Sequence, residues 1–149
     1  MLSGTDWMLA DFGKSDRQRL LRWLSRTPYS SHHQTIRKDV LVNSGTWLLE
    51  NKKYTTWEAS PVSTILWIHG IPGSGKTKLA STVIERLRSD VEIHNLPSDR
   101  VVTKSCLAYF YCERSTSEAD RSDPDNVMRC LLKQIAVSSA SVSLIHARL

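Results

Sequence analysis

Residues 70–77 read Gly-Ile-Pro-Gly-Ser-Gly-Lys-Thr, which fits the phosphate-binding template G-x-x-x-x-G-K-[ST]. The three glycines permit backbone conformations in which consecutive N–H groups turn toward one phosphate chain. Lys76 supplies a positive charge for the β- and γ-phosphates, and Thr77 offers a hydroxyl to a magnesium ion. The sequence therefore predicts a site for a nucleoside triphosphate, ATP or GTP, bound together with Mg²⁺.

The template indicates a phosphate site only when a strand precedes it and a helix follows it. Residues 65–68 are apolar and mostly favour strands, whereas Leu79, Val83 and Leu87 recur at helical spacing after the template. The N-terminus of that helix is expected to face the phosphates with its positive end. The residues expected to bind the nucleotide are Gly70, Ile71, Pro72, Gly73, Ser74, Gly75, Lys76, Thr77 and Lys78.

Nucleotide hydrolysis needs more than this loop, because an acid at the end of an apolar strand normally organises the magnesium ion and the attacking water. The apolar run that ends in an acid is residues 109–113, which makes Glu113 the one catalytic candidate. Two interpretations stay open. Either Glu113 faces the phosphates, as in nucleoside kinases, or it is a solvated loop residue and the acid lies beyond Leu149. Whether the chain is an enzyme is therefore left open.

The pattern around the loop predicts an α/β fold, a parallel P-loop sheet with flanking helices that is incomplete in this chain. Residues 62–69 and 101–112 are the expected strands, joined by the helix after the loop into one right-handed unit. Residues 89–100 are interpreted as a connector and residues 138–149 as a Ser-rich connection with a weak apolar tail. We expect two parts, a helical N-terminal segment over residues 1–60 and a partial NTPase domain over residues 61–149.

Two further helices are predicted from their caps and apolar faces. Ser15 begins a short amphipathic helix that ends before Pro28, and residues 29–33 after it are polar and unpatterned. Asp123 and Pro124 begin a second helix. Its apolar face is expected to comprise Val127, Met128, Leu131, Leu132, Ile135 and Ala136.

Two shorter signals concern a turn and a pair of histidines. Residues 43–46 resemble a turn and cap before a helix at 47–50, and Gly45 and Thr46 are candidates for contact with the nucleobase. His32 and His33 are adjacent, without the spacing of metal ligands, and are interpreted as surface residues.

Composition limits the possible partners. The net charge of +5 is spread along the chain, so no basic stripe indicates nucleic-acid binding. The three cysteines show no C-x-x-C pair, which disfavours a disulfide framework or zinc site, and we expect them to be buried or half-buried thiols. The sequence contains neither an apolar run long enough for a membrane span nor a signal peptide, so we expect a cytoplasmic protein.

Several motifs together carry a family resemblance. They are residues 20–25 (Leu-Leu-Arg-Trp-Leu-Ser), 45–49 (Gly-Thr-Trp-Leu-Leu), Tyr54 with Trp57, 66–77 around the loop, 108–112 (Ala-Tyr-Phe-Tyr-Cys) and 131–134 (Leu-Leu-Lys-Gln). This succession resembles the NACHT-type, nephrocystin-like NTPase domain of fungal STAND proteins with ankyrin or WD repeats. The resemblance implies a nucleotide-dependent signalling switch that changes its assembly state, with C-terminal sensor and repeat domains that this chain lacks.

Two other hypotheses remain beside this one. A small P-loop nucleoside kinase would transfer phosphate to a nucleoside and would require Glu113. A non-catalytic interaction fragment would instead self-associate whether or not nucleotide is present.

Overall fold

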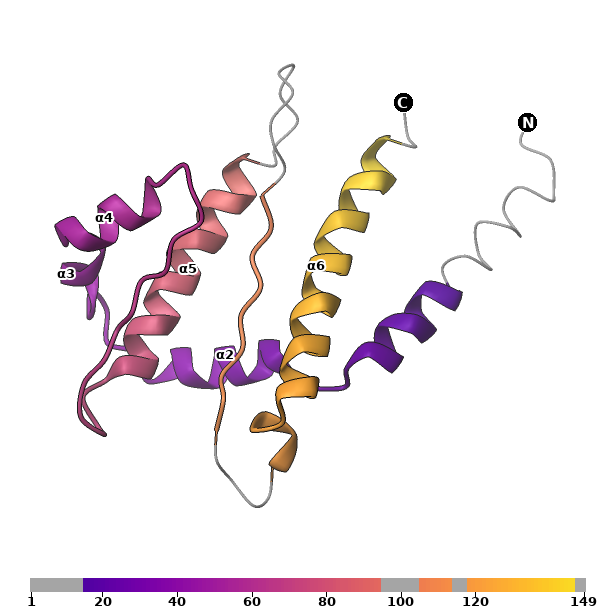
Figure 1. The fold of residues 1–149 in the computed structure, drawn as a ribbon, viewed down its shortest axis with the longest axis horizontal. Coiled ribbons are helices and arrows are strands. Elements are labelled where there is room, and N and C mark those ends of the chain that lie inside the picture. Colours follow the sequence, from indigo (N-terminus) through magenta and orange to yellow (C-terminus); the bar gives the residue numbers. More distant parts are fainter. Residues whose placement is uncertain (1–14, 95–104, 114–117, 147–149) are drawn as a thin grey trace. The chain divides into compact units, whose positions relative to one another are not determined.

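The computed structural model describes residues 15–94, 105–113 and 118–146 (Figure 1). Residues 15–24 are helical. The elements that follow are α2 (Tyr29–Lys38), α3 (Thr46–Leu49), α4 (Lys52–Glu58), α5 (Lys76–His94), the 3₁₀ helix η1 (Ala119–Arg121) and α6 (Pro124–His146). The chain divides into two compact units, one made of residues 1–29 and 108–149 and the other of residues 30–107. The two units are described separately below.

The predicted parallel sheet is wrong for this structure, because the described residues form helices and irregular segments and contain no strand. Residues 62–69 and 105–112 are the described parts of the two expected strands, and neither belongs to a β-ladder. Residues 101–104 of the second expected strand lie outside the described ranges. A β-favouring composition suits an extended backbone, but a strand also requires a neighbour that pairs with its N–H and C=O groups.

Several helix predictions are confirmed. The helix at residues 15–24 ends before Pro28, and the helix after the loop begins at Lys76. Asp123 caps α6, since its carboxylate oxygen accepts a hydrogen bond from the Asp125 N–H at 3.2 Å.

Other boundaries differ from the prediction. Residues 29–33, expected to be unpatterned, form the first half of α2. Within the predicted connectors, α5 continues to His94 and α6 to His146. Both helices run past the point where their apolar periodicity fades, which shows that helix formation there does not require a regular apolar stripe.

In the unit of residues 30–107, α3 and α4 form a small cluster, and α3 packs on α5 (Figure 1). Tyr54 is its most enclosed aromatic residue, with 1% of its surface exposed, and its hydroxyl donates to a Glu58 carboxylate oxygen at 2.8 Å. Burial, together with this hydrogen bond, raises the pKa of Tyr54 well above its usual range. The Tyr54 and Trp57 ring centroids are 5.7 Å apart, whereas Trp47 is largely exposed.

Gly45 allows α3 to approach α5 closely. Its φ is +85°, a left-handed conformation that favours glycine. A Cβ at this position would lie 3.0 Å from a Leu79 methyl carbon and 3.4 Å from the Thr82 hydroxyl oxygen. The glycine of the Gly-Thr-Trp-Leu-Leu motif therefore serves both the turn and the packing of α3 on the helix that follows the loop.

In the unit of residues 1–29 and 108–149, polar contacts join the helix at residues 15–24 and the chain after it to α6. Lys133 donates to the Ser25 carbonyl oxygen at 2.7 Å, and Arg17 donates to the Ala136 carbonyl oxygen at 3.3 Å. Over residues 124–138, the part of α6 whose side chains the structure describes, Cys130 and Gln134 are buried. Burial raises the pKa of the Cys130 thiol.

Two expectations about burial are corrected here. The predicted apolar face of α6 is not covered uniformly, because Met128, Leu132 and Ile135 are exposed. Cys106 and Cys112, expected to be at least half-buried, are exposed, whereas Cys130 is buried as predicted. Helical or strand periodicity identifies which residues share a face, but it does not show whether another element covers that face.

Candidate functional site

The loop at residues 70–77 has the backbone conformation that its glycines predict. Gly73 and Gly75 have φ angles of +79° and +83°, where a residue with a side chain would be strained. The Ser74 N–H donates to the Ile71 carbonyl oxygen at 3.2 Å, which closes a tight turn between them. The loop thus reverses direction immediately before α5 begins at Lys76.

Lys76 folds back over this turn. Its ammonium group donates to the carbonyl oxygens of Gly70 at 2.9 Å and Ile71 at 2.8 Å, and it lies 3.5 Å from the Ser74 hydroxyl. The Ser74 hydroxyl oxygen also lies close to Gly70, where a Cβ would approach it to 2.9 Å and would require this side chain to rotate. The lysine charge is therefore held at the loop itself.

The first turn of α5 adds a second source of positive potential. The helix has 19 residues and carries no acidic side chain in its first turn. The first N–H groups of an α-helix have no partner within the helix, and its aligned peptide dipoles place partial positive charge there. The Leu79 N–H donates to the Gly75 carbonyl oxygen at 3.0 Å. Thr77 lies in this turn and is exposed. The N-terminus of α5 can therefore receive an anion.

Lys78 is the last of the residues expected to bind the nucleotide. Its ammonium group contacts the C-terminal end of α2. It donates to the Ile36 carbonyl oxygen at 3.1 Å and lies 3.4 Å from a carboxylate oxygen of Asp39. The structure therefore brings together the charge of Lys76 and the loop glycines, and it places the charge of Lys78 against another helix.

The remaining candidates lie apart from these contacts. Gly45 packs against α5 at Leu79 and Thr82, while the Thr46 hydroxyl donates to the Asn43 carbonyl oxygen at 3.0 Å. Contact of either residue with a nucleobase stays a prediction.

Glu113 belongs to the other unit and forms an ion pair with Arg121. The Arg121 guanidinium also bonds a Glu118 carboxylate oxygen at 2.7 Å and the Tyr111 carbonyl oxygen at 3.2 Å. The ion pair with Arg121 gives the Glu113 carboxylate a structural partner, and none of these contacts indicates a catalytic role. No observation on the described residues therefore favours the kinase hypothesis.

Sequence reasoning missed one contact, between a buried histidine and a half-buried glutamate. His33 was expected at the surface, but 2% of it is exposed, and its Nε2 lies 2.7 Å from a Glu85 carboxylate oxygen. Glu85 also bonds Arg88 at 3.1 Å. Two adjacent histidines gave no signal to distinguish the buried His33 from the half-buried His32, because the helix that turns His33 toward α5 was itself not predicted.

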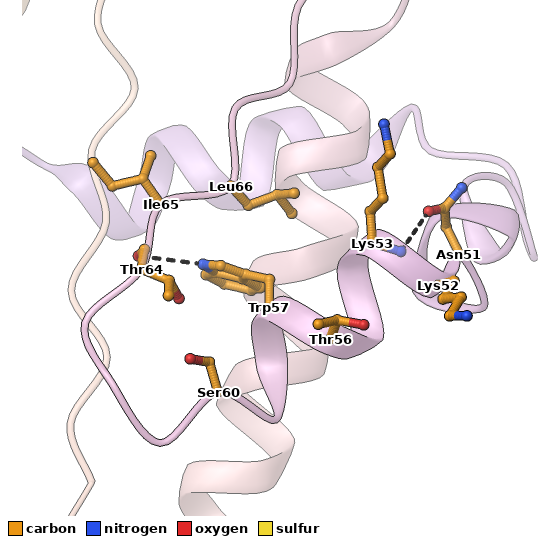
Figure 2. A pocket seen from close by; sticks show the side chains of 9 residues that line it. All are labelled: Asn51, Lys52, Lys53, Thr56, Trp57, Ser60, Thr64, Ile65 and Leu66. Atoms are coloured by element: carbon orange, nitrogen blue, oxygen red, sulfur yellow. Dashed lines mark hydrogen bonds between the residues drawn. The ribbon is translucent and has the colours of Figure 1, made fainter.

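A separate groove of about 770 Å³ lies between α4 and the extended chain that leads to the loop (Figure 2). It is lined by Asn51, Lys52, Lys53, Thr56, Trp57, Ser60, Thr64, Ile65 and Leu66. The Trp57 indole N–H donates to the Thr64 carbonyl oxygen at 3.4 Å, which ties the two walls together (Figure 2). The groove offers an apolar wall and two lysines, and none of its lining residues belongs to the loop.

The residues that the structure describes carry neither a clustered metal site nor a membrane-spanning helix. These residues include no group of three or more His, Cys, Asp or Glu side chains that could hold a metal ion. Within the same ranges, no helix combines the length and apolar composition that crossing a bilayer requires.

Comparison with known proteins agrees with the family resemblance. The family model described as Nephrocystin 3, N-terminal, matches residues 43–148, which include the entire loop. The vegetative incompatibility protein HET-E-1 of Podospora anserina is 27% identical over 109 residues, covering 73% of this chain and 7% of that protein. No solved structure matches the chain at a significant level. The extent of the family match shows that the chain belongs to the nephrocystin 3 N-terminal family.

Proposed function

We propose that this chain binds the phosphates of ATP or GTP, together with Mg²⁺, through residues 70–77. The observation that carries the proposal is the shape of the loop. Two left-handed glycines precede the N-terminus of a 19-residue helix, and the Lys76 ammonium group is held directly over the turn. This arrangement combines the first N–H groups of α5, the dipole of that helix and the full positive charge of Lys76, each of which attracts a phosphate.

The contacts of Lys76 suggest how a phosphate enters. Its two carbonyl partners are neutral, whereas a phosphate oxygen carries negative charge and accepts a stronger, charge-assisted hydrogen bond. The ammonium group therefore exchanges carbonyl oxygens for phosphate oxygens when a nucleotide binds. The exposed Thr77 hydroxyl is the protein group that would hold the magnesium ion beside the phosphates.

The same proposal extends to a role as part of a STAND-type, NACHT-like switch. It is supported by membership of the nephrocystin 3 N-terminal family and by similarity to a relative whose name describes vegetative incompatibility. Because the chain spans 7% of that relative, self-association and the participation of sensor or repeat domains are parts of the proposal. Hydrolysis is not included, since no residue of the described chain has contacts that favour a catalytic acid.

The direct test is titration of the chain with fluorescent ATP and GTP analogues in the presence of Mg²⁺. Lys76→Ala is expected to weaken binding at least about a hundredfold, because it removes a charge-assisted contact to phosphate. Lys53→Ala is the matched control, since it makes the same substitution at an exposed lysine that lines the separate groove. Binding that is lost in Lys53→Ala but kept in Lys76→Ala would place the nucleotide in the groove and overturn the proposal.

A further inference from the structure

The C-terminal end of α2 lies against the first turn of α5 (Figure 1). Lys78 makes this contact, with its ammonium group 3.1 Å from the Ile36 carbonyl oxygen and 3.4 Å from the Asp39 carboxylate. Both partners belong to the same compact unit as the loop. Lys78 immediately follows Thr77 in the sequence, so the contact lies within one helical turn of the proposed phosphate site.

Electrostatics explains why Lys78 needs these partners. A cation in the first turn of a helix is repelled by the positive end of the helix dipole and, in this case, by the neighbouring Lys76. The last turn of α2 presents carbonyl oxygens that carry partial negative charge, and Asp39 adds a full negative charge. Contact between the two helix ends therefore offsets the repulsion and fixes their relative position.

A second contact ties the same helices together. Glu85 lies seven residues after Lys78 on α5, which corresponds to about two helical turns and places both residues on the same face. Glu85 bonds the buried ring of His33 on α2 at 2.7 Å. With two fixed points on α5, α2 restrains both the position of the helix and its rotation about its own axis.

We propose that Lys78 is a positioning residue for the phosphate site and does not itself contact phosphate. Its bond to α2 holds the first turn of α5, including the N–H groups that would face the ligand. Nucleotide affinity then depends on the contact between α2 and α5. This inference rests on the proposed function of residues 70–77.

Two variants distinguish positioning from direct phosphate contact. If Lys78 bound phosphate directly, Asp39→Asn would release a competing partner and strengthen nucleotide binding. If Lys78 positions α5, Asp39→Asn weakens binding instead, about twofold, because the Ile36 carbonyl contact remains. Asp39 has 80% of its side chain exposed, so its replacement is not expected to prevent folding.

The experiment measures the dissociation constant of a fluorescent ATP analogue with Mg²⁺ for the wild type, Lys78→Met, Lys78→Arg, Asp39→Asn and the double variant Lys78→Met/Asp39→Asn. We expect Lys78→Met to weaken binding about threefold to tenfold and Lys78→Arg to restore most of the affinity. The double variant should bind no more weakly than Lys78→Met, since both changes remove the same contact. Unfolding curves of each variant show that the comparison is made between folded proteins.

Several outcomes would overturn the inference. They are additive losses in the double variant, tighter binding by Asp39→Asn, or unchanged affinity in Lys78→Met. If the wild type binds nucleotide and Lys78→Met binds it with the same affinity, only the positioning role is excluded. If the folded wild type binds no nucleotide, both the proposed function and this inference are excluded. If Lys78→Met does not fold, the direction of the change in Asp39→Asn decides the question alone.

Discussion

The Gln134 side chain holds the segment at residues 108–113 through its bonds to Tyr109, and a single substitution tests this contact. Its side-chain N–H donates to the Tyr109 carbonyl oxygen at 2.8 Å, and its side-chain oxygen accepts from the Tyr109 N–H at 3.2 Å. The glutamine is buried, with 4% of its surface exposed. One side-chain amide therefore makes the pair of backbone bonds that an adjacent strand would otherwise provide.

Gln134→Met keeps the length of the side chain and removes both bonds. Each lost hydrogen bond costs about 0.5–1.5 kcal/mol, and backbone groups deprived of a partner in a half-buried site cost about 1 kcal/mol more. The greater hydrophobicity of methionine returns a part of this, so the free energy of unfolding is expected to fall by about 2–3 kcal/mol. Urea unfolding of the full chain measures the change.

Leu132→Met is the matched control, because it introduces the same side chain two residues away at an exposed position of α6. Its effect is expected to stay within about 0.5 kcal/mol. Amide hydrogen exchange at Tyr109 gives a second readout and should accelerate in Gln134→Met alone. The reasoning is refuted if Gln134→Met matches the control in stability and leaves exchange at Tyr109 unchanged.

Two further predictions concern cysteine reactivity and pH. Cys106 and Cys112 are exposed, whereas Cys130 is buried with a raised thiol pKa, so we expect rapid alkylation of the first two in the native protein and of Cys130 only after unfolding. Mass spectrometry of the alkylated chain checks this, and fast native labelling of Cys130 would contradict its burial. Burial raises the pKa of Glu85, but the hydrogen bond with its histidine partner and nearby arginine charges outweigh burial, so that its pKa lies below the usual value. A carboxyl whose pKa is lower in the folded state than in the unfolded state stabilises the fold at pH values above the unfolded pKa, which is about 4.3 for Glu. This contribution is lost as the pH falls from that value through the lower, folded-state pKa. Glu85→Gln should therefore flatten the acid side of the stability profile by about 1 kcal/mol or less, since 38% of the side chain is exposed and screened. An equally steep loss of unfolding free energy in wild type and variant would exclude this contribution.

Local signals in the sequence predicted the parts of the fold that depend on neighbouring residues. Asp123 marks a helix beginning because a side-chain cap acts within one turn, and the left-handed glycines of the loop follow from a template of eight residues. The turn at Gly45 was predictable for the same reason. Its close packing on α5 was not, because that contact joins residues far apart in the sequence.

The sheet could not be predicted correctly from composition alone. Residues 105–113 include three aromatic residues, which favour a strand, but the partner of Tyr109 is the side chain of Gln134, and nothing in a periodic pattern identifies it. The same limit applies to Lys78. Its sequence position beside Thr77 indicated phosphate binding. Its actual partners, Ile36 in α2 and Asp39 just after it, depend on a helix of low apolar content that the pattern did not show.

The most direct test of the central claim is equilibrium binding of a fluorescent ATP analogue with Mg²⁺ to the wild type and Lys76→Ala, with Lys53→Ala as the control. We predict saturable binding to the wild type and the control, and a loss of at least about a hundredfold in affinity in Lys76→Ala. Equal affinity of all three proteins, or absence of binding to the folded wild type, would contradict the assignment of residues 70–77 as a nucleotide phosphate site.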